Sequence, residues 1–201
     1  MMSRRGVLGM LAGGAAALLS GCNLFGGSAY RYRLTVEVQT AKGVRTGSGV
    51  REVSMTENFV LTAHESPYSG GETGEAVVVD LPSGPVFLLL RGADAMGQPL
   101  DVEITRALVG RKTEPGADHL SAVQELDGSA GIKAELPREH WPMMVRFADI
   151  NDPKSVEQVD PASIGVKRIT VETTSDDVTT GIEKRLGWLG TSPQFSDTFE
   201  K

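Results

Sequence analysis

The first regular pattern along the chain is an alternation of apolar and polar residues from Tyr30 to Thr40. This period of two is typical of a β-strand with one buried face. Ala41-Lys42-Gly43 then supplies a three-residue turn, with glycine where a left-handed residue belongs. The segment from Val44 to Thr56 follows as a second strand, so the pattern predicts a long antiparallel hairpin.

The second predicted strand changes its apolar phase between Val50 and Val53, next to Gly47-Ser48-Gly49. A glycine inside a strand usually marks a bulge, at which one strand carries an extra residue. We therefore predict a β-bulge at this glycine pair, with a ligand-binding loop as the alternative.

Short apolar runs predict four more strands. Two of them flank Pro82-Ser83-Gly84-Pro85, which indicates a second hairpin, and two lie in the C-terminal half of the chain. The turn-forming residues from Ser66 to Gly74 predict a loop instead. The four predicted strands are Ala76–Leu81, Val86–Leu90, Pro142–Phe147 and Val166–Thr173.

The apolar pattern between residues 100 and 109 fits two structures. Leu100, Val102 and Ile104 alternate as in a strand, whereas Leu100, Ile104 and Leu108 have helical spacing. Both interpretations stay open for this segment. A helical turn is also predicted around residues 119–126.

The C-terminal part of the chain has the spacing of a short amphipathic helix. Thr180 and Glu183 are three residues apart, as in a capping box, and Ile182, Leu186 and Leu189 follow at helical spacing. Residues 191–201 are interpreted as a flexible tail. The whole pattern predicts a mainly β fold, a small antiparallel β-sandwich-like domain over residues 30–190 with one or two short helices.

Residues 1–21 have the layout of a signal peptide. Arg4 and Arg5 form a basic start, and the uncharged stretch Gly6–Leu19 that follows is rich in glycine and alanine. A membrane-spanning helix needs about 20 apolar residues, so this stretch is too short to be one. A buried N-terminal helix of a cytosolic domain is the alternative.

Leu19-Ser20-Gly21-Cys22 resembles the lipobox of bacterial lipoproteins. This resemblance implies that a diacylglycerol is attached to the sulfur of Cys22 and that a peptidase cuts before it. Cys22 is the only cysteine of the chain, so an intramolecular disulfide is impossible. Residues 22–29 are then a lipid-anchored tether, and membrane lipid is the expected partner.

Two features bear on export and destination. Arg4-Arg5 in its sequence context resembles a twin-arginine export signal, although Val7 and Gly9 depart from that pattern, and the general export route stays open. Asn23 follows the cysteine, where an Asp would favour the inner membrane. The sequence therefore predicts a lipid-anchored protein of the cell envelope that faces the periplasm, on the outer membrane rather than the inner.

The charge of the chain argues against nucleic acid as a partner. Removal of the signal peptide takes away two arginines and no acidic residue, which moves the net charge from −6 to −8. A basic patch for nucleic acid or anionic lipid is therefore not indicated. An envelope protein stays a candidate partner.

No familiar catalytic, cofactor or metal motif is complete in this sequence. Asp127-Gly128-Ser129-Ala130-Gly131 lacks the first glycine of a serine hydrolase elbow, and Gly92–Pro99 lacks the lysine of a phosphate-binding loop. Asp149-Ile150-Asn151-Asp152 begins like a calcium loop, but Pro153 occupies the third ligand position, so a turn before a short helix is expected. We accordingly predict no catalytic residue, no cofactor and no metal site.

The three histidines lie far apart in sequence, at positions 64, 119 and 140, which does not suit a zinc site. His64-Glu65 and Glu139-His140 are interpreted as exposed loop pairs. Asp101 and Glu103 would share one face of a strand as surface charges.

Several segments resemble a family of uncharacterised, mainly proteobacterial exported lipoproteins. The family often has Pro before the tryptophan, where this chain has Gly187, and the region 92–135 does not match. The resemblance supplies no catalytic residue. The matching segments are Tyr30–Val38, Gly47–Val50, Phe147–Pro153, Val159–Pro161, Lys167–Glu172 and Thr179–Leu186.

These observations favour a non-enzymatic binding or envelope-assembly module anchored to a membrane. The alternative is an envelope hydrolase or carbohydrate-active enzyme that uses dispersed Asp, Glu and His residues. Glycosidases work with two carboxylates about 5 to 9.5 Å apart, which no sequence pattern reveals. A cleft in which His64, His119 or His140 meets carboxylates would favour the enzyme.

Overall fold

The computed structural model describes residues 27–62, 64–92 and 100–190. Several predicted features lie outside these ranges. They are the basic pair Arg4 and Arg5, the lipobox Leu19-Ser20-Gly21-Cys22, and the tail 191–201.

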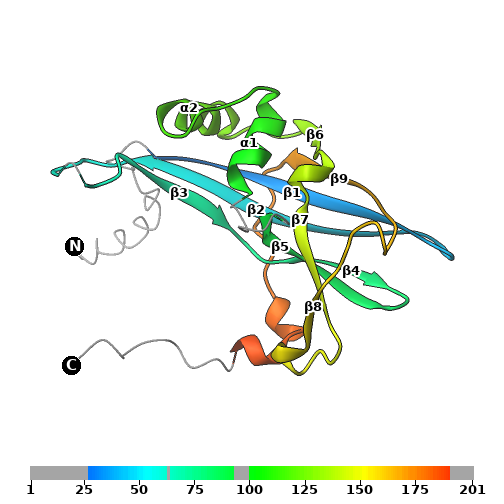
Figure 1. Ribbon diagram of the computed structural model, residues 1–201. Helices are drawn as coiled ribbons and strands as arrows, with labels where there is room; N and C mark the ends of the chain where they lie inside the picture. The colour runs from blue at the N-terminus through cyan, green and yellow to red at the C-terminus, as the bar shows by residue number, and fades with distance from the viewer. Residues whose placement is uncertain (1–26, 63, 93–99, 191–201) are drawn as a thin grey trace, which may run out of the picture.

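The described residues form two antiparallel sheets. The larger sheet has five strands, in the order β3-β2-β1-β9-β6. Its long central strand β1 pairs with β2 on one side and with β9 on the other (Figure 1). The strands are β1 (Gly27–Thr40), β2 (Gly43–Glu57), β3 (Tyr68–Thr73), β6 (Lys133–Glu135) and β9 (Val166–Thr173).

The smaller sheet has four strands, in the order β4-β5-β7-β8. They are β4 (Val77–Leu81), β5 (Gly84–Gly92), β7 (Pro142–Phe147) and β8 (Val156–Gln158). Two α-helices, α1 (Asp101–Val109) and α2 (Ala117–Leu126), lie between β5 and β6 in the chain. Four 3-10 helices complete the described part, η1 (Arg138–His140), η2 (Pro153–Ser155), η3 (Ile182–Lys184) and η4 (Gly187–Gly190).

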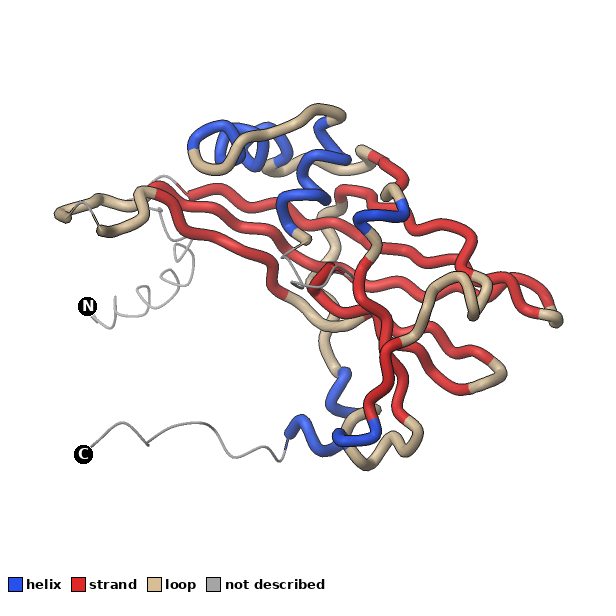
Figure 2. The backbone as a smooth tube through the Cα atoms, in the orientation of Figure 1, coloured by secondary structure: helices blue, strands red, loops and turns tan. Residues whose placement is uncertain are grey.

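One main core joins both sheets and both helices. Alternate residues of β1, from Tyr30 to Val38, are buried and form the centre of this core. The helix α2 contacts β1 and β2, while β4 contacts the same two strands farther along the sheet (Figure 2). The buried face of the larger sheet is therefore covered partly by helices and partly by the smaller sheet.

A second, smaller cluster lies on the other face of the smaller sheet. Phe87 of β5 and Val145 of β7 are buried there against Leu186. The ring of Phe147 packs edge-on against Phe87 and against Trp188. The C-terminal segment thus covers a face that the main core leaves open.

The mainly β, two-sheet antiparallel fold confirms the predicted fold class. The strand predicted over Pro142–Phe147 is β7, and that over Val166–Thr173 is β9, each with the predicted bounds. The hairpin around Pro82-Ser83-Gly84-Pro85 is confirmed as β4 and β5. The turn predicted before a short helix at Asp152 is confirmed, because its carboxylate accepts the backbone N–H of Lys154 at the start of η2.

The predicted bulge at Gly47-Ser48-Gly49 is wrong. The register of β1 with β2 is continuous over its whole length, and Val36 pairs with Gly47 as regularly as Arg33 pairs with Val50. The apparent change of phase arises because Arg51 points inward, so every second residue from Gly47 to Met55 is buried. Val50 is buried as well, on the opposite side of the strand. Gly47 instead allows the backbone of β4 to approach, since a Cβ there would lie 2.3 Å from the carbonyl oxygen of Val78.

The loop predicted over Ser66–Gly74 is also wrong, because β3 occupies most of it. Gly70 explains the misassignment. It pairs with Met55 of β2, and a Cβ there would lie 2.3 Å from the carbonyl oxygen of Ser54. The glycines that favoured a loop permit a close contact between strands.

The segment 100–109 is the helix α1, which decides between the two open interpretations. Ile104 and Leu108 are buried, and Leu100 precedes them in the same core. Gly110 ends the helix in the left-handed conformation at φ 68°, as helix-ending glycines commonly do.

The C-terminal amphipathic helix predicted from the Thr180–Glu183 spacing is wrong. The segment forms the short 3-10 helices η3 and η4, and no side chain at the cap position bonds to η3. The carboxylate of Glu75, far away in sequence, accepts the backbone N–H groups of Gly181 at 2.9 Å and Ile182 at 2.8 Å instead. A tertiary cap thus replaces the predicted local one.

The first strand begins earlier than predicted. β1 starts at Gly27, so the predicted tether over residues 22–29 ends inside the sheet, and four residues separate Cys22 from the strand. The chain from Cys22 to Gly27 spans at most about 18 Å, because one extended residue covers about 3.6 Å.

Candidate functional site

The helix α1 presents two different sides. Ile104 and Leu108 face the core, which leaves Glu103, Arg106 and Ala107 on the outer side. Glu103 and Arg106 are one turn apart, and their side chains form an ion pair at 2.6 Å between Oε1 and Nη1. Arg106 also donates to the backbone carbonyl of Thr113, so its guanidinium is fixed from two directions.

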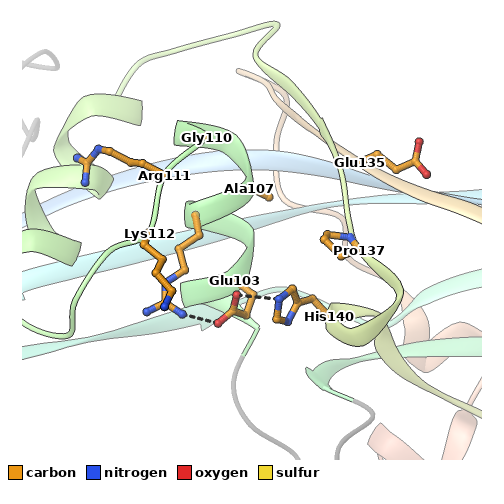
Figure 3. Close-up of a pocket in the computed structure, with 9 residues that line it drawn as sticks. Glu103, Ala107, Gly110, Arg111, Lys112, Glu135, Pro137 and His140 are labelled. Carbon is orange, nitrogen blue, oxygen red and sulfur yellow. Dashed lines mark hydrogen bonds and ion pairs between the residues drawn. The ribbon is translucent and has the colours of Figure 1, made fainter.

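A second segment brings a histidine to this helix. Pro137 precedes η1, and this 3-10 turn places the Nε2 atom of His140 at 3.3 Å from the Oε2 atom of Glu103. Glu103 therefore contacts a cation at one carboxylate oxygen and an imidazole at the other (Figure 3).

These side chains line an open pocket of about 460 Å³. This volume lies within the usual range of small-molecule sites, about 300 to 1,000 Å³. Three cationic and two carboxylate side chains border it, which makes the rim more positive than the protein as a whole. The lining residues are Glu103, Arg106, Ala107, Gly110, Arg111, Lys112, Glu135, Pro137 and His140.

Not every charged lining residue faces the pocket. Arg111 turns toward α2, where it pairs with Asp118 at 3.1 Å and Glu125 at 3.3 Å, and the Glu135 carboxylate points away from Glu103 (Figure 3). Lys112 has no ion-pair partner among the described residues. The charge most available to a ligand is therefore the Lys112 ammonium group.

The three histidines do not meet. His64 is exposed on the loop between β2 and β3, as predicted for the His64-Glu65 pair. His119 is buried on α2, where Nδ1 lies 3.5 Å from the Thr113 hydroxyl and burial lowers the pKa of the imidazole. Only His140 meets a carboxylate in a pocket, so its interpretation as part of an exposed loop pair is incomplete.

A buried polar cluster lies on the inner side of the larger sheet, centred on Arg51. The guanidinium is 0% exposed, and all of its nitrogen atoms donate hydrogen bonds. Nε donates to the carbonyl of Glu75 at 3.1 Å, Nη2 to those of Leu88 at 2.8 Å and Leu89 at 3.4 Å, and Nη1 to Glu72 at 3.2 Å. Arg51 thereby joins β2 to β3 and β5.

Glu72 is the counterion of this arginine, and its side chain is only 4% exposed. Its Oε1 atom accepts hydrogen bonds from Arg51 and from the hydroxyl of Tyr32. Burial raises the pKa of Glu72 above its ordinary 4.5, although the charge of Arg51 acts in the opposite direction. Burial also raises the pKa of Tyr32 well above 10, so this phenol stays protonated and remains a donor.

Two carboxylate oxygens near this cluster are buried without a hydrogen-bond partner, Oε2 of Glu72 and Oδ1 of Asp101. The prediction that Asp101 shares a strand face with Glu103 as a surface charge is wrong. Asp101 begins α1 instead, and the two side chains take different environments because neighbours two apart on a helix face different directions.

Other predicted positions show ordinary structure. Ser129 lies in the loop after α2, which agrees with its interpretation as a loop residue rather than a hydrolase elbow. Among the described residues, no three His, Cys, Asp or Glu side chains gather closely enough to hold a metal ion. Within the same residues, no helix has both the length and the apolar character needed to cross a membrane.

Sequence reasoning missed both the Glu103–His140 contact and the Arg51–Glu72 pair. A signal existed for Arg51, which falls at an inward position of β2 between Gly49 and Val53. No local pattern signals the contact between Glu103 and His140, because the two residues lie on different elements of the chain.

No protein-family model, curated protein or solved structure matches this chain.

Proposed function

We propose that this protein is an exported bacterial lipoprotein, acylated at Cys22, that acts in the cell envelope as a non-enzymatic binding module. The observation that carries the proposal is the order along the chain. A lipobox-like Leu19-Ser20-Gly21-Cys22 is followed, five residues after its cysteine, by the first strand of the folded part at Gly27. Two acyl chains hold a protein stably on a membrane, at about 0.8 kcal/mol for each buried CH₂ group.

The anchor has a direct test. Cys22→Ser should abolish incorporation of labelled fatty acid and release the protein into the soluble periplasmic fraction, since no other cysteine can take the lipid. Separation of inner from outer membranes then locates the acylated protein. Continued acylation of the serine variant would refute the anchor.

The pocket beside α1 is the candidate binding site, and its chemistry favours a small ligand with a carboxylate or phosphate group. Arg106 and His140 both contact Glu103, so this carboxylate is already paired. Lys112 is the lining cation without such a partner among the described residues. A carboxylate or phosphate group of the ligand, placed beside Lys112 and His140, would pair with the Lys112 ammonium group.

Binding can be measured by NMR titration of the mature protein with inorganic phosphate and with succinate. We expect amide shifts confined to residues 110–112 and 138–140, which Lys112→Ala abolishes. Lys133→Ala is the matched control, because Lys133 is also exposed but pairs with Glu172 at 3.1 Å on the larger sheet. Shifts that persist unchanged in Lys112→Ala would contradict the site.

The Glu103–His140 contact also favours a second candidate, an envelope hydrolase. This pair could position a proton acceptor, yet the described residues that line the pocket include no Ser, Thr or Cys nucleophile. The second carboxylate, Glu135, points away (Figure 3). Hydrolysis of p-nitrophenyl acetate or p-nitrophenyl glycosides that His140→Gln abolishes and His64→Gln leaves intact would favour the enzyme over the binding module.

A further inference from the structure

The loop between β2 and β3, residues 58–67, carries an unusual pair of side chains. Phe59 is 78% exposed and Leu61 is 80% exposed, the two highest values among the large hydrophobic residues of the described chain. Single exposed apolar residues are common on protein surfaces. Two of them in one loop form a small exposed apolar patch. The loop itself protrudes beyond the end of the larger sheet (Figure 2).

Several polar groups of this loop are hydrogen-bonded to one another. Its ends are joined by the Asn58 N–H and the Pro67 carbonyl at 2.7 Å. The N–H of Leu61 donates to the carboxylate of Glu65 at 2.9 Å, and the amide of Asn58 donates to the Ser66 carbonyl at 3.2 Å. Because these polar groups are paired inside the loop, contact with an apolar phase would not leave them unsatisfied.

The patch lies at the end of the sheet where the chain enters from Cys22. Gly27, the first residue of β1, pairs with Thr56, and Phe59 follows three residues later. In Figure 1 the β2–β3 loop protrudes from the end at which β1 begins, and the β1–β2 turn lies at the opposite end. The five-residue step from Cys22 to Gly27 spans at most about 18 Å, so a lipid on Cys22 stays close to this end.

The charge of this loop indicates which kind of membrane contact it can make. Residues 58–67 contain one acidic residue, Glu65, and neither lysine nor arginine, and the mature chain is acidic. An electrostatic attraction to anionic lipid is therefore absent from this loop, and apolar contact with acyl chains is the interaction that its residues can make.

We propose that Phe59 and Leu61 insert into the bilayer surface that holds the Cys22 lipid, so that the protein contacts the membrane at two points. This inference rests on the proposed lipid anchor. It adds an orientation, with the β2–β3 loop toward the bilayer and the β1–β2 turn away from it.

The test uses the lipidated mature protein in phosphatidylethanolamine–phosphatidylglycerol vesicles. Cys22 is the only natural cysteine, and acylation blocks its sulfur, so an introduced cysteine is the only thiol open to a fluorophore. Phe59→Cys places a polarity-sensitive probe on the patch. Val44→Cys is the matched control, since Val44 is also exposed, at 55%, but lies beside the β1–β2 turn.

We expect the probe at position 59 to emit at shorter wavelength in vesicles and to be quenched by doxyl groups on the lipid chains. The probe at position 44 should show neither effect. Leu61→Cys should behave like Phe59→Cys, which guards against a local disturbance by one substitution. Equal emission and no quenching at positions 59 and 44 would overturn the proposal. Photocrosslinking from position 59 to a second copy or to another protein, without lipid quenching, would also overturn it.

Flotation of the vesicles separates the two proposals. If the protein floats with the lipid and the probes at 59 and 44 behave alike, only the loop contact fails. If the protein does not float and the mass of its N-terminal peptide lacks the lipid, the anchor itself fails.

Discussion

Arg51 places a guanidinium in the interior of a small β protein, where its energetic effect depends on complete pairing. Three backbone carbonyls and the Glu72 carboxylate accept its hydrogen bonds. An arginine inside a strand pattern predicts a side chain that points to solvent. The loop predicted over Ser66–Gly74 also places its partner Glu72 outside the sheet. The alternation of β2, in contrast, signals that Arg51 points inward, but no local pattern places its partner Glu72, on β3, beside it.

Arg51→Met should lower the free energy of unfolding by about 3–5 kcal/mol, because it leaves the Glu72 charge buried without its partner. Urea unfolding followed by circular dichroism measures the loss. Arg45→Met is the control on the same strand, where the residue is exposed and little change is expected. Equal effects of the two substitutions would show that the pair does not hold β2, β3 and β5 together.

The raised pKa of Glu72 predicts a dependence of stability on pH. In the folded protein Glu72 binds a proton more tightly than at its ordinary pKa of 4.5 in the unfolded chain. Its contribution is therefore fully present below pH 4.5 and is lost as the pH rises from there through the raised value. Glu72→Gln should remove this fall from the curve of unfolding midpoint against pH, whereas Glu57→Gln, an exposed control, should retain it. Parallel curves for wild type and Glu72→Gln would contradict the prediction.

At the scale of elements, alternation and turn residues were sufficient for β1, β4, β5, β7 and β9, whose apolar runs are long or bounded by proline and glycine. They failed for β3 and for the C-terminal segment. Gly70 fits a strand because a neighbouring backbone needs its space, and the Thr180–Glu183 spacing is overridden because Glu75 reaches the same amides. In both cases the deciding partner is distant in the chain, so a local pattern cannot show it.

Gly47→Ala should destabilise the protein by about 1–3 kcal/mol, a usual cost of overpacking, because the new methyl group would meet the Val78 carbonyl at 2.3 Å. Thermal unfolding measures the change. Gly71→Ala is the matched control in β3, where nothing lies within 4 Å of the added carbon. If Gly47→Ala is as stable as Gly71→Ala, the close approach of β4 to β2 is not what requires this glycine.

Glu75→Ala should loosen the C-terminal segment, because two amides at the start of η3 lose their acceptor. Hydrogen exchange at Gly181 and Ile182 should accelerate, while the amides of β1 keep their protection. Glu183→Ala tests the local capping box that the sequence suggested and should leave exchange unchanged, since no side-chain cap is formed at η3. Faster exchange in Glu183→Ala alone would restore the local interpretation.

At the scale of the whole molecule, the fold class followed from the sequence, but the pocket did not. Glu103 depends on α1, which the pattern left undecided, and His140 depends on η1, which it did not indicate. Their meeting requires the two segments to pack on the same side of the larger sheet. Long-range packing therefore created the candidate site, while the lipobox-like motif, a purely local feature, is readable from the chain alone.

The place of β1 in its sheet has a mechanical consequence. The strand nearest Cys22 is central, with hydrogen bonds to β2 on one side and β9 on the other. A pull on the chain before Gly27, directed along the strand, would load both ladders at once instead of peeling one bond after another from an edge, because these bonds run across the strand axis. A protein held by this end would therefore carry the force on both ladders in shear.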